Sequence, residues 1–164
     1  IPAGEKGVVA GMEKGPLAGY PVVDVRTAVF FGKHHDVDSS EMAFKIAAET
    51  CFHQAILKAS PILLEPFSDV EVRVPEDFLG DVMGDLSSKR GKILGTAADG
   101  HYQVIKAKVP MAELYKYASH LRSLTQGRGL VSTAFSHYEE VPRELADKVI
   151  AAAKAEKEAG AAHA

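Results

Sequence analysis

The sequence predicts an α+β protein whose larger part is an antiparallel four-stranded sheet with two helices on one face. The first observation is a repeat, because residues 70–75 and 105–110 are both valine-rich strands that end at a proline and lead into a helix. The second observation is that each helix is followed by a glycine stop and a further strand, 92–97 in one copy and 130–140 in the other. This βαβ–βαβ order closes as a ferredoxin-like domain.

The helices of the two copies support the repeat. Leu79 and Leu86 of the first helix stand at the same offset from their strand as Leu114 and Leu121 of the second. We expect the first helix to end near Gly91 and the second near Gly127 or Gly129, the latter through a glycine of positive φ.

Before the repeat, residues 3–14 read as a short helix weakened by glycine, and residues 20–31 as a strand rich in valine and phenylalanine. A second helix is expected from Asp38 to about Ala59. Asp38 would cap it and Glu41 would reach back as in a capping box. Its expected apolar stripe consists of Met42, Ile46, Ala47 and Ile56.

Residues 63–66 read as a linker near a domain boundary, since Ser60-Pro61 stops the second helix. After the repeat, a last helix is expected from Pro142, which suits a first helical turn, to about Glu158. The alanine-rich residues beyond it are expected to fray.

The composition is that of a folded protein, with 46% hydrophobic and 25% charged residues. The single cysteine, Cys51, excludes an internal disulfide framework and suits the reducing cytoplasm. No apolar run approaches the roughly 20 residues that span a bilayer, and no signal peptide is recognisable. The chain does not begin with methionine, which suggests a fragment. Because the net charge is −3, any nucleic-acid contact must come from local patches.

Nucleotide-binding loops of the common types do not occur in the sequence, so we expect this chain alone not to bind GTP. The glycine-rich stretch 127–129 is interpreted as a helix stop. Nothing pairs a nucleophile with a base and an orienting group. Cys51 lies in mid-helix beside Phe52 and is interpreted as an inert, half-buried thiol rather than a nucleophile.

The turn after residue 31 leaves three hypotheses open. His34, His35 and Asp36, with a distant His53, could hold a metal ion, although neighbouring side chains of an extended chain point apart and no metal-ligand spacing is present. The turn could simply be solvated. It could also be a recognition tip, together with Lys33.

Between residues 101 and 130, five basic residues stand against the single acid Glu113. These basic residues are Lys106, Lys108, Lys116, Arg122 and Arg128. Interleaved with Tyr115 and Tyr117, they could hold a phosphate backbone, and ordinary surface lysines are an equally good interpretation.

Several longer motifs then resemble those of bacterial elongation factor G. The first is Gly-Pro-Leu-Ala-Gly-Tyr-Pro-Val-Val-Asp-Val at 15–25, and the second is His-Asp-Val-Asp-Ser-Ser-Glu-Met-Ala-Phe-Lys at 35–45. Leu-Glu-Pro at 64–66, Gly-Asp-Val-Met-Gly-Asp-Leu at 80–86, Leu-Arg-Ser-Leu-Thr-Gln-Gly-Arg-Gly at 121–129 and His-Tyr-Glu-Glu-Val-Pro at 137–142 follow in order.

The resemblance implies a domain organisation. Residues 1–61 would be the C-terminal part of domain IV, an incomplete split β-α-β fold. Residues 62–141 would be the ferredoxin-like domain V, and residues 142–164 a C-terminal helix and tail.

The resemblance also implies a function. The full-length factor would be a cytoplasmic, monomeric GTPase that uses GTP and Mg²⁺ and promotes tRNA–mRNA translocation on the ribosome, with no membrane contact. Lys33, His34, His35 and Asp36 would form the tip that enters the A site. Domain V would rest near the stalk-base proteins and ribosomal RNA, with Lys106, Lys108, Arg122 and Arg128 as RNA contacts.

Phe31 and His34 depart from the usual pattern of the family, which suggests a divergent paralogue. A ribosome-protection or recycling factor of the same architecture is therefore the alternative function. A small metal-dependent enzyme at the His34–His35 turn is a further hypothesis from another class.

Overall fold

The computed structural model describes residues 1–35, 37 and 39–162, and the chain forms two compact units. One unit contains Ile1–Ile62 with Pro142–Ala164, and the other contains Leu63–Val141.

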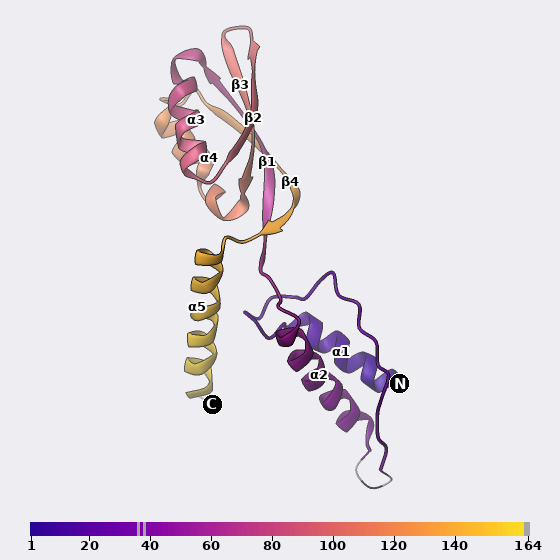
Figure 1. Cartoon of the computed structure of the whole chain (residues 1–164). Coiled ribbons are helices and arrows are strands. Elements are labelled where there is room, and N and C mark those ends of the chain that lie inside the picture. The colour runs from indigo at the N-terminus through magenta and orange to yellow at the C-terminus, as the bar shows by residue number, and fades with distance from the viewer. Residues whose placement is uncertain (36, 38, 163–164) are drawn as a thin grey trace. The chain divides into compact units, whose positions relative to one another are not determined.

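The second unit is the predicted ferredoxin-like domain. Its strands are β1 (Leu64–Pro75), β2 (Lys92–Asp99), β3 (Tyr102–Pro110) and β4 (Leu130–Glu140), in the order β2-β3-β1-β4 with every pair antiparallel. The helices α3 (Leu79–Ser88) and α4 (Tyr117–Leu124) lie together on one face of the sheet (Figure 1). The α+β class and the βαββαβ order are therefore confirmed.

Buried and exposed residues alternate along the central strands, and the buried ones form the core of this unit. Val70, Val72 and Val74 of β1 point under the helices and are buried, while the residues between them are exposed. The expected repeat leucines follow the same rule, since Leu86 and Leu121 are fully buried. The buried cluster comprises Val70, Val72, Val74, Val82, Leu86, Ile105, Ala107, Val109, Tyr117 and Leu121.

Each helix of the repeat is shorter than expected and is preceded by a 3₁₀ turn, η1 (Glu76–Phe78) before α3 and η2 (Met111–Leu114) before α4. The proline that ends each strand fixes its own backbone angle and starts these turns. Gly127 has φ +82° after α4, which confirms its role as a helix stop.

The linker expected at 63–66 was wrong for residues 64–66, which belong to β1. Leu64 pairs with Glu140 and Pro66 with Tyr138, so the end of β4 supplies their partner. The pairing of β1 with β3 begins only at Phe67, so Pro66 has a strand on one side alone. A proline is tolerated there because its missing N–H is not needed by a second neighbour.

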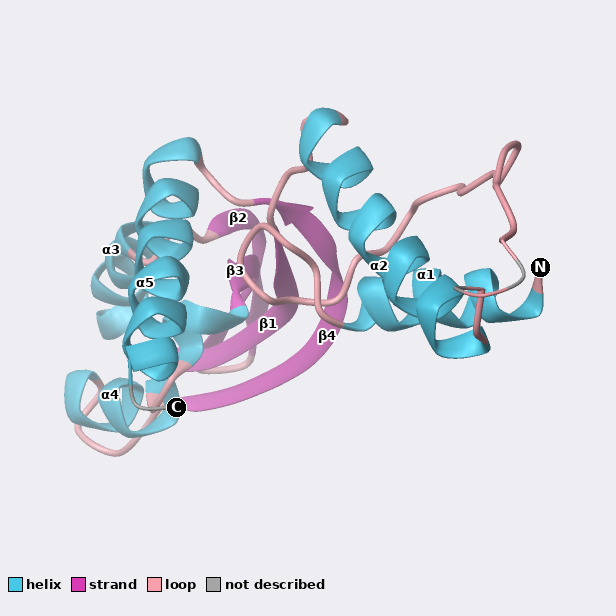
Figure 2. Ribbon diagram, turned by 90° about the horizontal axis from the view of Figure 1, so that it is seen from below, coloured by secondary structure: helices cyan, strands magenta, loops and turns pink. Residues whose placement is uncertain are grey.

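The first unit is built on α1 (Pro2–Glu13) and α2 (Glu41–Lys58), which lie side by side in both views (Figures 1 and 2). The helix α1 turns Gly7 and Gly11 toward α2, and both glycines are buried. A Cβ at Gly7 would collide with the carbonyl oxygen of Lys45 and lie 2.9 Å from Ala48 Cβ. One at Gly11 would lie 2.9 Å from Phe52 Cδ1. The glycines that weaken α1 as a helix therefore allow it to approach α2 closely.

The apolar stripe expected on α2 was wrong for three of its four members. Met42, Ile46 and Ala47 are exposed, and Phe52 and Ile56 are the residues that α2 buries. Packing against α1 determines which residues of α2 are buried, because α2 turns toward α1 the side that fits closely against Gly7 and Gly11.

The strand expected over 20–31 was also wrong, because the structure has no strand there. Val29 is 74% exposed and Phe30 is 96% exposed. An extended segment becomes a stable strand only when a neighbour bonds its backbone groups. Within the described residues of this unit no other strand is present to do so.

The last helix, α5 (Arg143–Ala162), runs past the end expected near Glu158. The helix begins at Arg143, one residue after the predicted start, and the carbonyl of Pro142 accepts from the N–H groups of Leu145 and Ala146, both at 2.9 Å. The alanine-rich residues up to Ala162 are thus part of the helix, and their fraying stays a prediction.

The glycine contact between α1 and α2 gives a test of this unit. Gly7→Ala should destabilise the pair by about 1–3 kcal/mol, because the methyl group forces the helices apart. Amide hydrogen exchange in α1 and α2 measures the effect. Gly4→Ala is the matched control, since a Cβ there meets nothing within 4 Å and the exchange should slow slightly. Equal slowing of exchange in both variants would contradict the close-packing argument.

Candidate functional site

The predicted tip residues Lys33, His34 and His35 are exposed and stand just ahead of α2 in the chain. The ring of His34 stacks on Phe44 of α2, with centroids 6.3 Å apart and planes 12° from parallel. The fourth predicted tip residue, Asp36, lies outside the described residues.

Two neighbouring serines connect this segment to α2. The Ser39 hydroxyl accepts a hydrogen bond from the backbone N–H of His35 at 2.7 Å. The Ser40 hydroxyl accepts from the N–H of Ala43 at 3.1 Å and caps the helix. The expected cap, Asp38, lies outside the described residues. The pair of serines thus attaches the His35 backbone to the start of a helix that Ser40 caps.

The expected capping-box acid, Glu41, has a different partner. Its carboxylate lies 2.7 Å from Lys6 Nζ of α1, and this hydrogen bond, together with the lysine charge, lowers the pKa of Glu41. Both side chains are exposed, so the pair contributes little stability. Its effect is to join the beginning of α2 to α1.

His53 and Cys51 are the two other candidate residues of the first unit. His53 Nε2 lies 3.1 Å from the carbonyl oxygen of Gly11, at the α1–α2 contact. In the part of the chain that the structure describes, no group of three His, Cys, Asp or Glu residues is placed to hold a metal ion. Cys51 is exposed, so the prediction that it is half-buried was wrong.

The basic residues predicted as an RNA patch fall on two sides of the second unit. Lys106 and Lys108 lie on the sheet face away from the helices, as expected from alternation. They face two acids of β1: Lys106 is 3.9 Å from Glu71, and Lys108 is 3.4 Å from Asp69. The excess of positive charge counted along the chain is therefore largely cancelled across the strands.

Arg122 and Arg128 lie on the helix side instead. Arg122 is exposed on α4, and no acid pairs with it among the described residues. Arg128 follows the Gly127 stop and places its guanidinium 4.7 Å from the centre of the Phe78 ring. These two arginines keep their charge available to an outside anion.

A bulge in β4 produces a second polar cluster that the sequence did not reveal. Consecutive residues of β1, Phe67 and Ser68, pair with His137 and Phe135, so Ser136 has no partner in the ladder. One extra residue reverses the alternation beyond it. Ser136 and His137 therefore share the open face.

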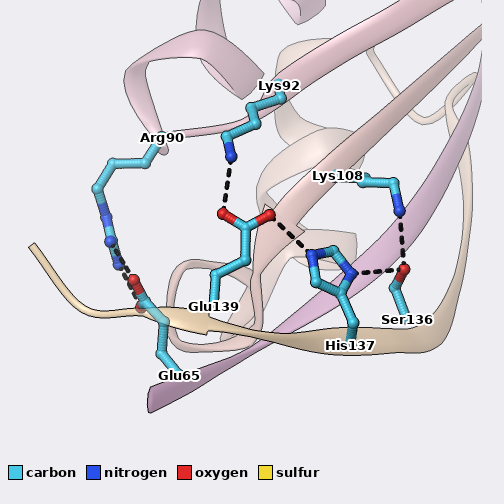
Figure 3. Close-up of polar contacts among 7 residues, drawn as sticks. All are labelled: Glu65, Arg90, Lys92, Lys108, Ser136, His137 and Glu139. Carbon is cyan, nitrogen blue, oxygen red and sulfur yellow. Dashed lines mark hydrogen bonds and ion pairs between the residues drawn. The ribbon is translucent and has the colours of Figure 1, made fainter. Parts of the chain in front are cut away.

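The cluster on the open face joins three strands (Figure 3). Lys108 Nζ lies 3.0 Å from Ser136 Oγ, which lies 3.0 Å from His137 Nδ1. His137 Nε2 lies 2.7 Å from Glu139, and Lys92 Nζ lies 2.7 Å from the other oxygen of that carboxylate. The hydrogen bond from Lys92 and then that from His137 lower the pKa of Glu139. The adjacent polar residues Ser136 and His137 did not mark the bulge, because Ser132 and Thr133 form another such pair in a regular part of the same strand.

Beside this cluster, Arg90 holds β1 to the turn after α3 (Figure 3). Its guanidinium donates to both oxygens of Glu65 at 2.6 and 2.8 Å and lies 3.4 Å from Glu113. The paired geometry with Glu65 raises the pKa of Arg90, which is charged in any case. Glu113, the one acid of the predicted basic stretch, is therefore already engaged.

The described residues contain no helix with the length and apolar character needed to cross a bilayer. The surface features are thus an exposed histidine segment hydrogen-bonded to Ser39, two arginines without a paired acid in the described chain, and a polar cluster whose members hydrogen-bond to one another. Hydrogen-bond donors held in place suit binding to oxygen-rich ligands such as nucleic-acid backbones.

Comparison with known proteins covers both units. The family described as "Elongation factor G, domain IV" matches residues 1–60, and "Elongation factor G C-terminus" matches residues 62–149. The chain is 55% identical over 150 residues to the elongation factor G of Aquifex pyrophilus, a match over 92% of this chain and 22% of that protein. A crystal structure from Thermus thermophilus is similar at 41% identity and a TM-score of 0.81, covering 93% of this chain and 23% of that one. The chain thus spans about a fifth of the length of these relatives.

The Lys92–Glu139 pair predicts a pH dependence. Because the folded-state pKa of Glu139 is lowered, its stabilisation is present above the unfolded-state pKa and is lost as the pH falls through the folded-state value. Lys92→Met should raise the pKa of Glu139, which NMR of the carboxyl carbon measures. The variant should be less stable than the unaltered chain at neutral pH, and this difference in stability should disappear in acid.

Lys106→Met is the control for this experiment, because Lys106 contacts Glu71 only at 3.9 Å between exposed side chains. It should leave the titration of Glu139 in place. A Lys92→Met variant whose Glu139 titrates as in the unaltered chain would contradict the assignment.

Proposed function

The chain belongs to the elongation factor G family, and from this premise we propose that it is the ribosome-binding C-terminal portion of a translational GTPase that promotes tRNA–mRNA translocation. In this proposal the segment Lys33–His35 is the tip that enters the A site. GTP and Mg²⁺ are proposed for the full-length factor, and no described residue is assigned to them. The proposed setting is the cytoplasm, and the factor is proposed to act there as a monomer.

The observation that carries the proposal is the exposed His35 with its backbone held by Ser39. A histidine in this position donates a hydrogen bond to a phosphate or ribose oxygen in its neutral form as well as its charged form. The hydrogen bond from the His35 N–H to Ser39 restricts the backbone conformation at His35. The stacking of His34 on Phe44 holds the neighbouring ring. The tip contributes position, and no covalent chemistry is required of it.

Holding donors in one place favours the ribosome state that presents acceptors there. A factor biases a two-state motion only by binding the two states with different affinity. The α1–α2 pair, with its glycine contact and the Lys6–Glu41 link, supplies a support that does not have to be ordered on binding. The proposed tip therefore contributes to translocation without taking part in nucleotide hydrolysis.

The second unit is proposed to lie near ribosomal RNA and the stalk-base proteins. Arg122 and Arg128 support an RNA contact on the helix side, because their charge is not offset by a paired acid in the described chain. Lys106 and Lys108 support it less, since a phosphate there would have to displace or tolerate Glu71 and Asp69.

The test uses the full-length factor. His35→Ala should slow translocation by roughly three- to tenfold, the loss expected for one or two hydrogen bonds in the bound state. Ribosome-stimulated GTP hydrolysis should change little. Both rates are measured on the same preparation.

His101→Ala is the matched control, because His101 is an exposed histidine of the other unit. It should leave both rates unchanged. Equal loss of translocation and GTP hydrolysis in the His35 variant would overturn the role proposed for the tip.

A further inference from the structure

Tyr115 is the aromatic residue of the predicted basic stretch that stays at the surface. Tyr117, expected to accompany it, is buried in the core at 3% exposure, whereas Tyr115 is 79% exposed. Lys116 lies between them and places its Nζ 5.2 Å from the centre of the Tyr115 ring. An ammonium group at this distance is attracted to the face of the ring. One face of Tyr115 is thus occupied by a cation, and the large exposed fraction leaves the other face open to solvent.

The backbone at these two residues brings their side chains together. Tyr115 has φ −57° and ψ 123°, and Lys116 has φ 55° and ψ 19°. These angles are close to those of the two central residues of a type II turn, whose second central position is normally glycine or asparagine because φ is positive there. Neighbouring side chains of an extended chain point apart, so this turn is what allows the ammonium group to meet the ring.

A lysine at a position of positive φ is strained, and the fold gains no ion pair in return. Glycine would adopt the same conformation without the steric cost of a Cβ. No acid pairs with Lys116 in the part of the chain that the structure describes. Strain of this kind is retained most often where the side chain has a function. The geometry therefore indicates a use for the Lys116 side chain outside the fold.

The charge around Tyr115 and Lys116 favours an anionic ligand. No acidic residue occurs in the sequence from Leu114 to Tyr138, although this stretch contains three lysine and arginine residues. The preceding acid, Glu113, lies 3.4 Å from Arg90 and is engaged by it. A cation beside an open aromatic face suits a nucleotide, because the cation attracts the phosphate and the ring stacks on the base. An acidic peptide would use the cation and leave the ring unused.

We propose that Tyr115 and Lys116 form a stacking site for single-stranded RNA, in which a base lies on the open face of the Tyr115 ring and Lys116 contacts a neighbouring phosphate. The site rests on the proposed ribosome-binding function and adds a contact to a base. Arg122 and Arg128 contact phosphates, which all sequences share. Tyr115 selects an unpaired nucleotide, because the bases of a double helix are already stacked on one another.

The experiment uses the 164-residue chain, which contains no tryptophan. Tyr115→Trp therefore introduces a single fluorescent reporter that can stack as tyrosine does. Single-stranded oligoadenylate should quench its fluorescence at low ionic strength, where phosphate contacts are strongest. An oligomer of the same length with abasic riboses carries the same phosphates. It should bind roughly tenfold more weakly and quench little, because it offers no base to stack.

Substitutions separate the ring from the charge, with binding measured by the anisotropy of labelled oligoadenylate. Tyr115→Leu should weaken binding roughly tenfold, whereas Tyr115→Phe keeps the ring and should bind like the unaltered chain. Lys116→Gly should weaken binding without lowering the melting temperature, since glycine accepts the positive φ. Lys58→Met is the control for charge, because it removes an exposed lysine of the first unit and should leave binding unchanged.

Other outcomes would overturn the proposal. Equal binding of the abasic oligomer would reduce the site to a phosphate contact, and equal quenching by polyglutamate would assign it to an acidic protein surface. Unchanged binding in Tyr115→Leu, or no quenching by oligoadenylate, would exclude stacking on the ring. These measurements involve neither ribosomes nor GTP, so their failure is distinct from a failure of the His35 test of the proposed function.

Discussion

The requirement that extended backbone be paired on both sides governs this structure more than any single side chain. The strand β1 is central, with β3 on one side and β4 on the other, so its N–H and C=O groups are satisfied along most of its length. Its alternate valines then fill the space under α3 and α4. Residues 20–31 have a similar valine-rich composition and no such neighbours in the described chain, and they do not form a strand.

This constraint explains which parts of the fold were predictable. The ferredoxin-like domain was found from the sequence because two copies of one pattern supported each other, and each copy brought the strands that the other pairs with. The strand at 20–31 had no partner in the sequence to support it. The burial on α2 depended on the two glycines of α1, and a contact between helices cannot be read from the pattern of either helix alone.

The candidate site was predictable to a different degree in each unit. The tip segment was predicted from a resemblance to a family, and the structure shows that its residues 33–35 are exposed. The basic residues were found by counting along the chain, which overlooks the acids that strand pairing places opposite Lys106 and Lys108. The cluster around His137 was missed because a bulge changes which residues share a face, and one extra residue leaves only a weak trace in the sequence.

Ser39 accepts a hydrogen bond from the His35 backbone, and we propose that this bond holds the tip in position. The most direct measurement is hydrogen exchange of the His35 amide in the full-length factor, because this N–H is the donor to Ser39 at 2.7 Å. The account predicts protection that is lost in Ser39→Ala and kept in Ser40→Ala, whose cap serves Ala43 instead. Exchange of the His35 amide at the rate of an unstructured peptide, in the unaltered protein, would contradict it.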